Sequence, residues 1–179
     1  MTEPAVRPIT PADHDALLAF FGRVPEGDRT FFREDVLAPG VVERWFAEGG
    51  DPRFVATDGD DVVGYLAIIG EVGWSSHVAE LRVVVDPTRR RQGVGRALAR
   101  YGLLQALELG LTKLVVKVVA DQEPTLAMFS SLGFEAEALL KDHVRDASGT
   151  LRDLITMAHL VDDNWSAMRT TGIEDLVEG

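Results

Sequence analysis

The sequence predicts an α/β (α+β) fold in which a mixed central sheet of about six to seven strands is flanked by helices. The first observation is the order of expected elements: strand, helix, three strands, helix, strand, helix, two strands. Grouped strands favour this sandwich over a doubly wound sheet, where strands and helices alternate. The second is size, because 179 residues, 46% of them hydrophobic, suit one core better than two. We therefore expect a single domain over residues 1–160 and an acidic C-terminal tail over 161–179.

The N-terminal elements are a short strand at 6–9 and a helix that ends near residue 23. Thr10, Pro11 and Asp13 supply an N-cap, a first-turn proline and an acidic third residue, which together mark a helix start. Apolar residues at helical spacing should face the core, namely Leu17, Phe20, Phe21 and Val24. Residues 25–52 contain several Pro and Gly breakers around a short helix at 41–47, so we expect a variable, substrate-side segment.

The rest of the chain alternates between strand runs and two strongly periodic helices. Strands are expected at 54–57, 62–69, 78–85, 114–119, 135–142 and 151–160. A helix over 93–109 is closed by Gly110, and a second helix covers 123–131. The apolar face of the first helix is expected to consist of Ala97, Leu98, Tyr101, Leu104 and Leu107. The last two strands should flank a turn over residues 146–149.

Composition excludes several classes of function. A net charge of -11 argues against binding to a nucleic-acid backbone, which needs clustered cations. The absence of cysteine excludes disulfides and thiolate chemistry, and four scattered histidines give no metal site. The N-terminal residues lack a basic start and an apolar run, and no stretch approaches the roughly 18 apolar residues of a membrane span. We therefore expect a cytoplasmic protein without membrane contact.

One basic cluster departs from this acidic background. Arg89, Arg90, Arg91, Arg96 and Arg100 lie within a dozen residues, where a strand passes through a loop into a helix. Backbone N–H groups at a helix N-terminus bind anions, and the glycines there allow close approach of a phosphate. A solvated helix start with fortuitous arginines is the alternative interpretation.

Two other phosphate-binding motifs fail on this segment. No Lys-Ser or Lys-Thr pair follows the glycines, as a P-loop requires. Leu98 occupies the third glycine position of a dinucleotide fingerprint, and no suitable acidic residue lies about 20 positions later.

The segment instead resembles the GCN5-related N-acetyltransferase (GNAT) superfamily, whose signature Arg/Gln-x-x-Gly-x-Gly/Ala is matched from Arg90 to Gly95. The resemblance extends over about residues 5–160. It implies the GNAT fold, acetyl-CoA as cosubstrate, turn amides on the coenzyme A pyrophosphate, and a preceding strand beside the pantetheine arm. The implied cofactor-binding residues are Val83, Val84, Val85, Arg90, Arg91, Gln92, Gly93, Val94, Gly95 and Arg96.

Residues 128–134 resemble a second block of the same superfamily, with two departures. Gln122 stands where the family usually has Asn, and Phe129 where it usually has the Tyr that protonates the departing thiolate. A phenyl ring cannot donate a proton, so Phe129 is expected to pack in the core.

Glu80 is the candidate catalytic residue. An alkylammonium with a pKa of about 10.4 must lose a proton before it can attack a thioester, so a base or a desolvating pocket is required. The position of Glu80 is similar to that of the general-base Glu in protein lysine acetyltransferases of this superfamily. An outward-facing strand carboxylate is the alternative interpretation.

Other residues give weaker signals. His77 and His143 could relay protons, although surface positions are the simpler interpretation. An acidic loop could attract a cationic amine, or it could simply aid solubility; it contains Glu26, Asp28, Glu34, Asp35, Glu43 and Glu48. Phe31, Phe32 and Trp45 either line a slot for the acceptor or anchor the loop, and the anchor is favoured.

We therefore expect an enzyme, an acetyl-CoA-dependent N-acetyltransferase acting on a primary amine, with a preference for a protein lysine side chain. A small-molecule amine acceptor and a non-catalytic acyl-CoA sensor remain the alternatives. The expected partners are acetyl-CoA and an amine-bearing protein or small molecule, without nucleic acid, and family habit suggests a homodimer.

Overall fold

The computed structural model describes residues 4–29, 34–47 and 49–161, and these contain one seven-stranded sheet with the order β1-β2-β3-β4-β5-β7-β6. Its strands are β1 (Ala5–Pro8), β2 (Arg53–Asp58), β3 (Asp61–Gly70), β4 (Val78–Val85), β5 (Lys113–Val119), β6 (Glu135–Arg145) and β7 (Leu151–Leu160). Neighbouring strands are antiparallel except β4 and β5, which are parallel. The mixed sheet predicted from the sequence is thus confirmed.

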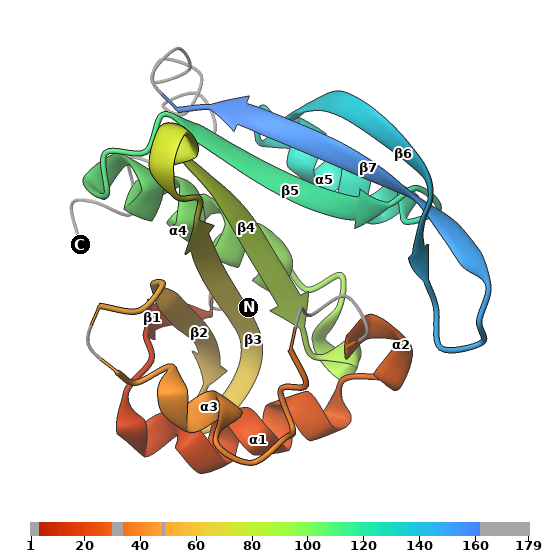
Figure 1. Ribbon diagram of the computed structural model, residues 1–179. Coiled ribbons are helices and arrows are strands. Elements are labelled where there is room, and N and C mark those ends of the chain that lie inside the picture. Colours follow the sequence, from red (N-terminus) through yellow and green to blue (C-terminus); the bar gives the residue numbers. More distant parts are fainter. Residues whose placement is uncertain (1–3, 30–33, 48, 162–179) are drawn as a thin grey trace.

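Helices cover both faces of this sheet (Figure 1). They are α1 (His14–Arg23), α2 (Glu26–Arg29), α3 (Val41–Arg44), α4 (Val94–Glu108) and α5 (Glu123–Ser131). One core lies between the sheet and α1 and α3, where Phe20, Phe21 and Tyr65 are buried. The other core lies on the opposite face, where Leu98 and Leu103 of α4 pack with apolar residues of β3, β4 and β5. The sites on β4 are therefore held by packing from two sides.

Two glycines let α4 lie close to the sheet. A Cβ at Gly64 of β3 would come within 2.7 Å of Leu98 Cδ1 and 2.9 Å of Val94 Cγ1. A Cβ at Gly102 of α4 would come within 2.6 Å of Leu81 Cδ1. Glycine inside a strand or helix weakens the element by itself, so close backbone approach is the reason for it here.

The expected apolar face of α4 packs in or against the core, but the prediction missed its most buried residues. Tyr101, Leu104 and Leu107 are only half-buried, and Leu103 and Ala106 are fully buried in their place. The buried stripe of the helix runs through Leu98, Gly102 and Ala106, and its middle residue is a glycine. Because a pattern of apolar side chains gives a glycine no weight, the prediction missed this most buried stripe of the helix.

Several boundaries differ from the sequence prediction. The helix expected at 41–47 ends at Arg44, and α2 was not expected, because four residues are too few to show helical periodicity. β6 continues to Arg145 rather than 142, with shifts of register against β7 and a positive φ of 51° at Asp142. The expected tail over 161–179 lies almost wholly outside the described residues. Among the helices of the described segments, none combines the length and apolar composition needed to cross a membrane.

Candidate active site

The two parallel strands of the sheet pair over a very short distance. The β4–β5 ladder contains only Val78 with Lys113, Ala79 with Leu114 and Glu80 with Val115. Both strands continue past this point, still paired on their outer sides with β3 and β7, while they separate from each other toward their carboxyl ends (Figure 1). Within the described chain, the inner backbone edges of 82–85 and 116–119 thus have no strand partner. An extended ligand can hydrogen-bond to such an edge as a further strand would.

The glycine-containing turn lies directly after the open part of β4. Arg91 and Gly93 have positive φ angles of 60° and 86°, and α4 begins at Val94. The amide of Ala97 reaches the carbonyl of Gly93 at 2.9 Å, so the preceding amides at the helix start have no acceptor within the helix. They point, with the positive end of the helix dipole, toward any bound anion.

Gly95 is constrained by its neighbours rather than by its φ angle. A Cβ there would lie 3.3 Å from Val85 Cγ2 and 3.5 Å from Met128 Sδ. The first turn of α4 is thus wedged between the end of β4 and α5. The expected phosphate-binding residues 90–96 and the expected strand residues Val83, Val84 and Val85 are brought together at one end of the opening.

Asp86 fixes the turn to the rest of the protein. Its carboxylate is 3% exposed and accepts hydrogen bonds from Arg23 Nε (2.7 Å), Thr88 N (2.9 Å) and Thr88 Oγ1 (2.7 Å). Burial alone would raise the pKa of Asp86, but hydrogen bonds from Thr88 and Arg23 outweigh it and lower the pKa. Sequence alone gives no sign of this role, because Arg23 is 63 residues away and carries no motif.

The basic cluster is only partly available to a ligand. Arg89 forms an ion pair with Asp58 at 2.7 Å, and Arg90 forms one with Asp28 of α2. Arg96 Nη1 donates to Ser131 Oγ of α5 at 2.7 Å, which keeps it beside the glycine turn. Among the described residues Arg91 has no ion-pair partner. Two of the five predicted arginines therefore serve to hold neighbouring loops.

Glu80 lies on the last rung of the β4–β5 ladder, between two cations. Its Oε1 accepts from Arg82 Nε at 2.7 Å, and its Oε2 accepts from Lys117 Nζ of β5 at 2.9 Å. Its side chain is only 12% exposed. Burial alone would raise the pKa of Glu80, but Arg82 and Lys117 outweigh it, and the pKa lies below its ordinary value. Glu80 is thus an ionised carboxylate that already holds an ammonium, and it is a weaker base than an unpaired one.

Phe129 is buried in the core, as the sequence predicted. It is 4% exposed and contacts Phe134 edge-on, with ring centroids 5.2 Å apart. Its helix, α5, begins after Gln122, whose carbonyl accepts from the Leu126 amide at 3.1 Å. No phenol stands at this position to serve as an acid.

The weaker candidates that the structure describes lie at the surface or make contacts within their loop. His77 and His143 are exposed, in agreement with the surface interpretation. Trp45 is 8% exposed and stacks on Tyr65 at 5.4 Å, so it anchors the loop, whereas Phe31 and Phe32 lie outside the described residues. Several acidic residues of the loop have local partners, as Glu34 accepts from Trp45 Nε1 at 3.0 Å.

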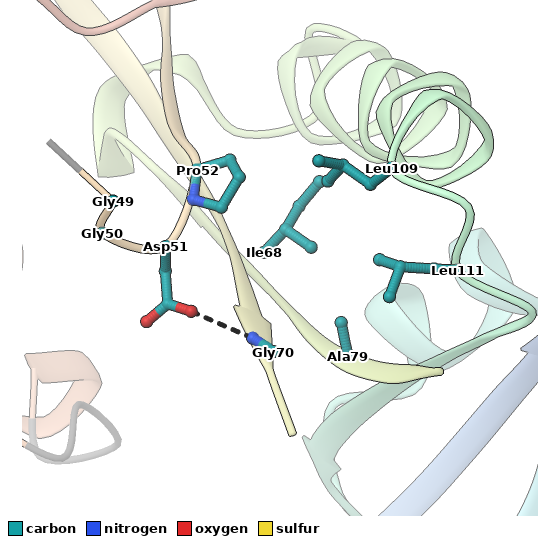
Figure 2. A pocket seen from close by; sticks show the side chains of 9 residues that line it. All are labelled: Gly49, Gly50, Asp51, Pro52, Ile68, Gly70, Ala79, Leu109 and Leu111. Atoms are coloured by element: carbon teal, nitrogen blue, oxygen red, sulfur yellow. Dashed lines mark hydrogen bonds between the residues drawn. The ribbon is translucent and has the colours of Figure 1, made fainter. Parts of the chain in front are cut away.

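A pocket of about 230 Å³ lies at the amino end of β4, opposite the end that leads into the glycine turn (Figure 2). It is lined by Gly49, Gly50, Asp51, Pro52, Ile68, Gly70, Ala79, Leu109 and Leu111. One polar contact at its rim joins two of the lining residues, with Asp51 Oδ1 accepting from the Gly70 amide at 3.0 Å. Because it contains neither the open strand edges nor the helix start, we do not include it in the active site.

The structure brings together an opening between two parallel strands, a glycine turn at a helix start and a buried carboxylate. The sequence profile of the acetyltransferase (GNAT) family matches residues 16–134. The chain therefore belongs to the acetyltransferase (GNAT) family.

Individual relatives share part of the sequence. The mycothiol acetyltransferase of Pseudarthrobacter chlorophenolicus is 32% identical over 139 residues, which cover 73% of this chain and 42% of that protein. The ribosomal protein bS18 alanine N-acetyltransferase of Escherichia coli is 32% identical over 76 residues, covering 42% of this chain and 51% of that protein. The chain thus spans only 42% and 51% of the lengths of these two relatives.

Solved structures match a larger share of the chain. The ribosomal-protein-alanine N-acetyltransferase of Brucella melitensis has a TM-score of 0.75 at 26% identity, covering 87% of this chain and 99% of that one. A GNAT-family acetyltransferase of Streptococcus pneumoniae reaches a TM-score of 0.76 at 19% identity, covering 88% of this chain and 99% of that one, and at that identity it shows the fold alone.

Proposed function

We propose that the chain is an acetyl-CoA-dependent N-acetyltransferase that transfers an acetyl group to a primary amine. The observation that carries the proposal is the separation of β4 from β5 directly before the glycine turn. Family membership supports the same chemistry, and the names of the relatives add N-acetylation of a protein and acetylation linked to mycothiol.

The residues present fit coenzyme A. Its pyrophosphate would be held by the amides at the start of α4 and by Arg91 and Arg96. Gly93 allows the left-handed turn, and its absent side chain leaves room for phosphate oxygens. The pantetheine arm carries amide groups, which match the open inner edge of Val83, Val84 and Val85. The thioester would then lie in the opening between the strands.

The chain's own groups prepare the acceptor amine. Glu80 is ionised and lies at the narrow end of the opening, so it can bind an ammonium and receive its proton. The free amine attacks the thioester carbon, the C–N bond forms and the C–S bond breaks. Phe129 cannot donate a proton to the departing thiolate. The thiolate therefore takes up the proton that the amine nitrogen loses after its attack on the thioester.

A cationic acceptor is favoured by the contact between Glu80 and Lys117 Nζ. The carboxylate already holds a lysine ammonium at 2.9 Å, which is the group that a protein lysine acceptor would present. The proposed acceptor is therefore a lysine side chain or a chemically similar amine of a protein, with a small-molecule amine as the second candidate. A non-catalytic acyl-CoA sensor would bind the cofactor without turnover.

The test combines cofactor binding with an acceptor screen. Acetyl-CoA should raise the melting temperature by the equivalent of about 2.7 kcal/mol at a hundredfold excess over Kd. The screen should show thiol release with lysine peptides, N-terminal alanine peptides, polyamines or amino sugars. The double variant Gly93→Asp with Gly95→Asp should lose both signals, because the added carboxylates fill the turn and repel phosphate. Normal binding by this variant would refute the assignment, and binding without thiol release from any amine would indicate a sensor.

A further inference from the structure

Lys117 of β5 lies beside Glu80 at the narrow end of the opening. The last paired rung joins Glu80 to Val115, and Lys117 follows two residues later, where β5 has parted from β4. Alternate residues of a strand face the same side, and the contact of Nζ with Glu80 Oε2 shows that this is the side of Glu80. The side chain is 35% exposed, so it is not locked in a dry core.

We propose that Lys117 is a self-acetylation site, which takes the acetyl group from acetyl-CoA bound in the same molecule. The inference rests on the proposed function. Its basis is geometry: the ammonium of Lys117 occupies the place beside Glu80 that the mechanism gives to the acceptor amine. Within one chain such an amine has a high effective concentration, because no second molecule has to bind.

The step balances without a further reactant. Lys117 Nζ gives one proton to the Glu80 carboxylate and attacks the acyl carbon of the thioester. The N–C bond forms and the C–S bond breaks, the nitrogen loses its second proton to the departing thiolate of coenzyme A, and Glu80 passes the first proton to solvent. The products are an N-ε-acetyl amide on Lys117 and free coenzyme A. The amide carries no charge, so Glu80 loses this ion pair and keeps the one with Arg82 at 2.7 Å.

The chain provides its own controls, because its only lysines are Lys113, Lys117 and Lys141. Lys113 is on the same strand, but it lies on a paired rung and binds Glu137 at 2.5 Å. Lys141 is an exposed residue of β6, the outermost strand. Neither has the Glu80 contact, so arginine replacements at these two positions are matched controls for the same replacement at 117.

The experiment incubates the purified full chain with acetyl-CoA and no acceptor, follows the intact mass and maps the modified peptide. We expect one acetyl group, on Lys117, gained at a rate that does not depend on protein concentration. Lys117→Arg should abolish the gain, and Lys113→Arg and Lys141→Arg should retain it. The variant Gly93→Asp with Gly95→Asp should also stay unmodified.

Three results would overturn the proposal. Equal labelling of Lys113 or Lys141, or labelling that persists in the glycine double variant, would indicate spontaneous reaction with the thioester. A rate that rises with protein concentration would indicate transfer between molecules. Thiol release with an added amine, together with an unmodified Lys117, would refute self-acetylation while the proposed function stands. Absence of both cofactor binding and thiol release would refute the proposed function itself.

Discussion

Replacing Asp86 with alanine should weaken both the fold and cofactor binding, because this carboxylate joins the glycine turn to α1. Three hydrogen bonds are lost, at 2.7, 2.9 and 2.7 Å. Hydrogen bonds to charged groups each contribute about 1.5–3 kcal/mol in a folded protein. The full sum does not apply, since Arg23 is 42% exposed and Thr88 is exposed, so both regain water as a partner.

We therefore expect a loss of about 2–3 kcal/mol in the free energy of unfolding, less than the ~3–5 kcal/mol for breaking a fully buried ion pair. For a chain of this size that corresponds to a fall of about 4–12 °C in melting temperature. If half of this free energy serves to hold the turn in its anion-binding shape, the Kd for acetyl-CoA should rise about tenfold in the variant.

Urea unfolding measures the first effect and titration calorimetry with acetyl-CoA the second. Asp146→Ala is the matched control, because Asp146 also holds a turn, with Ser148 N at 2.9 Å, Thr150 N at 3.0 Å and Arg152 Nε at 3.0 Å, but between β6 and β7. It should destabilise the protein without changing the Kd. An Asp86→Ala protein with an unchanged Kd, or a control with an equally raised one, would refute the proposed link between this anchor and cofactor binding.

Four further predictions concern packing, catalysis and pH. Gly64→Ala should lower the free energy of unfolding by about 1–3 kcal/mol through overpacking and raise the Kd for acetyl-CoA. Gly22→Ala is the contrasting case, because its Cβ would meet nothing within 4 Å. It should raise the free energy of unfolding measured in urea, since alanine favours a helix more than glycine does. Phe129→Tyr should fold and remain active but lose about 1–3 kcal/mol, because its hydroxyl has no partner in the core; an unchanged melting temperature would contradict this. Glu80→Gln should lower turnover about 10²-fold at neutral pH and leave the Kd for acetyl-CoA unaltered. The loss of turnover should become smaller as the pH approaches the pKa of the acceptor amine, because more of the amine is then deprotonated without help from the enzyme. A pH profile of turnover identical to wild type would exclude a proton-accepting role for Glu80. Hydrogen bonds from Arg7 lower the pKa of Asp13 from 3.8 to about 2. The ionised carboxylate therefore contributes its full stabilisation above pH 3.8, and this stabilisation is lost as the pH falls toward 2. In Asp13→Asn the melting temperature should fall less steeply with decreasing pH over this range than in the wild type.

The parts of the fold that could be predicted are those with local signals. The strand Val78–Val85, the helix Glu123–Ser131 and the strand Leu151–Leu160 were predicted with their observed bounds, because turn residues delimit each apolar run. The glycine turn was also visible, since Gly93 and Gly95 follow a buried strand.

The parts that could not be predicted depend on residues distant in sequence. Lys117 meets Glu80 across 37 positions, and a lone lysine in a strand looks like any solvated residue. Burial would raise the pKa of Glu80, but Arg82 and Lys117 together hold it in ion pairs and lower that pKa. Local patterns identified the carboxylate but could not identify the cations that set its basicity.

The three-rung contact between β4 and β5 means that the sheet has four edges instead of two. The outer edges belong to β1 and β6, and the inner two face each other in the middle of the molecule. The unpaired backbone N–H and C=O groups of an edge strand can hydrogen-bond to another chain. The same holds for the inner edges of β4 and β5 as long as no ligand lies between them. If acetyl-CoA binds as proposed, its pantetheine arm would lie between these inner edges in the place of a missing strand and would complete the sheet.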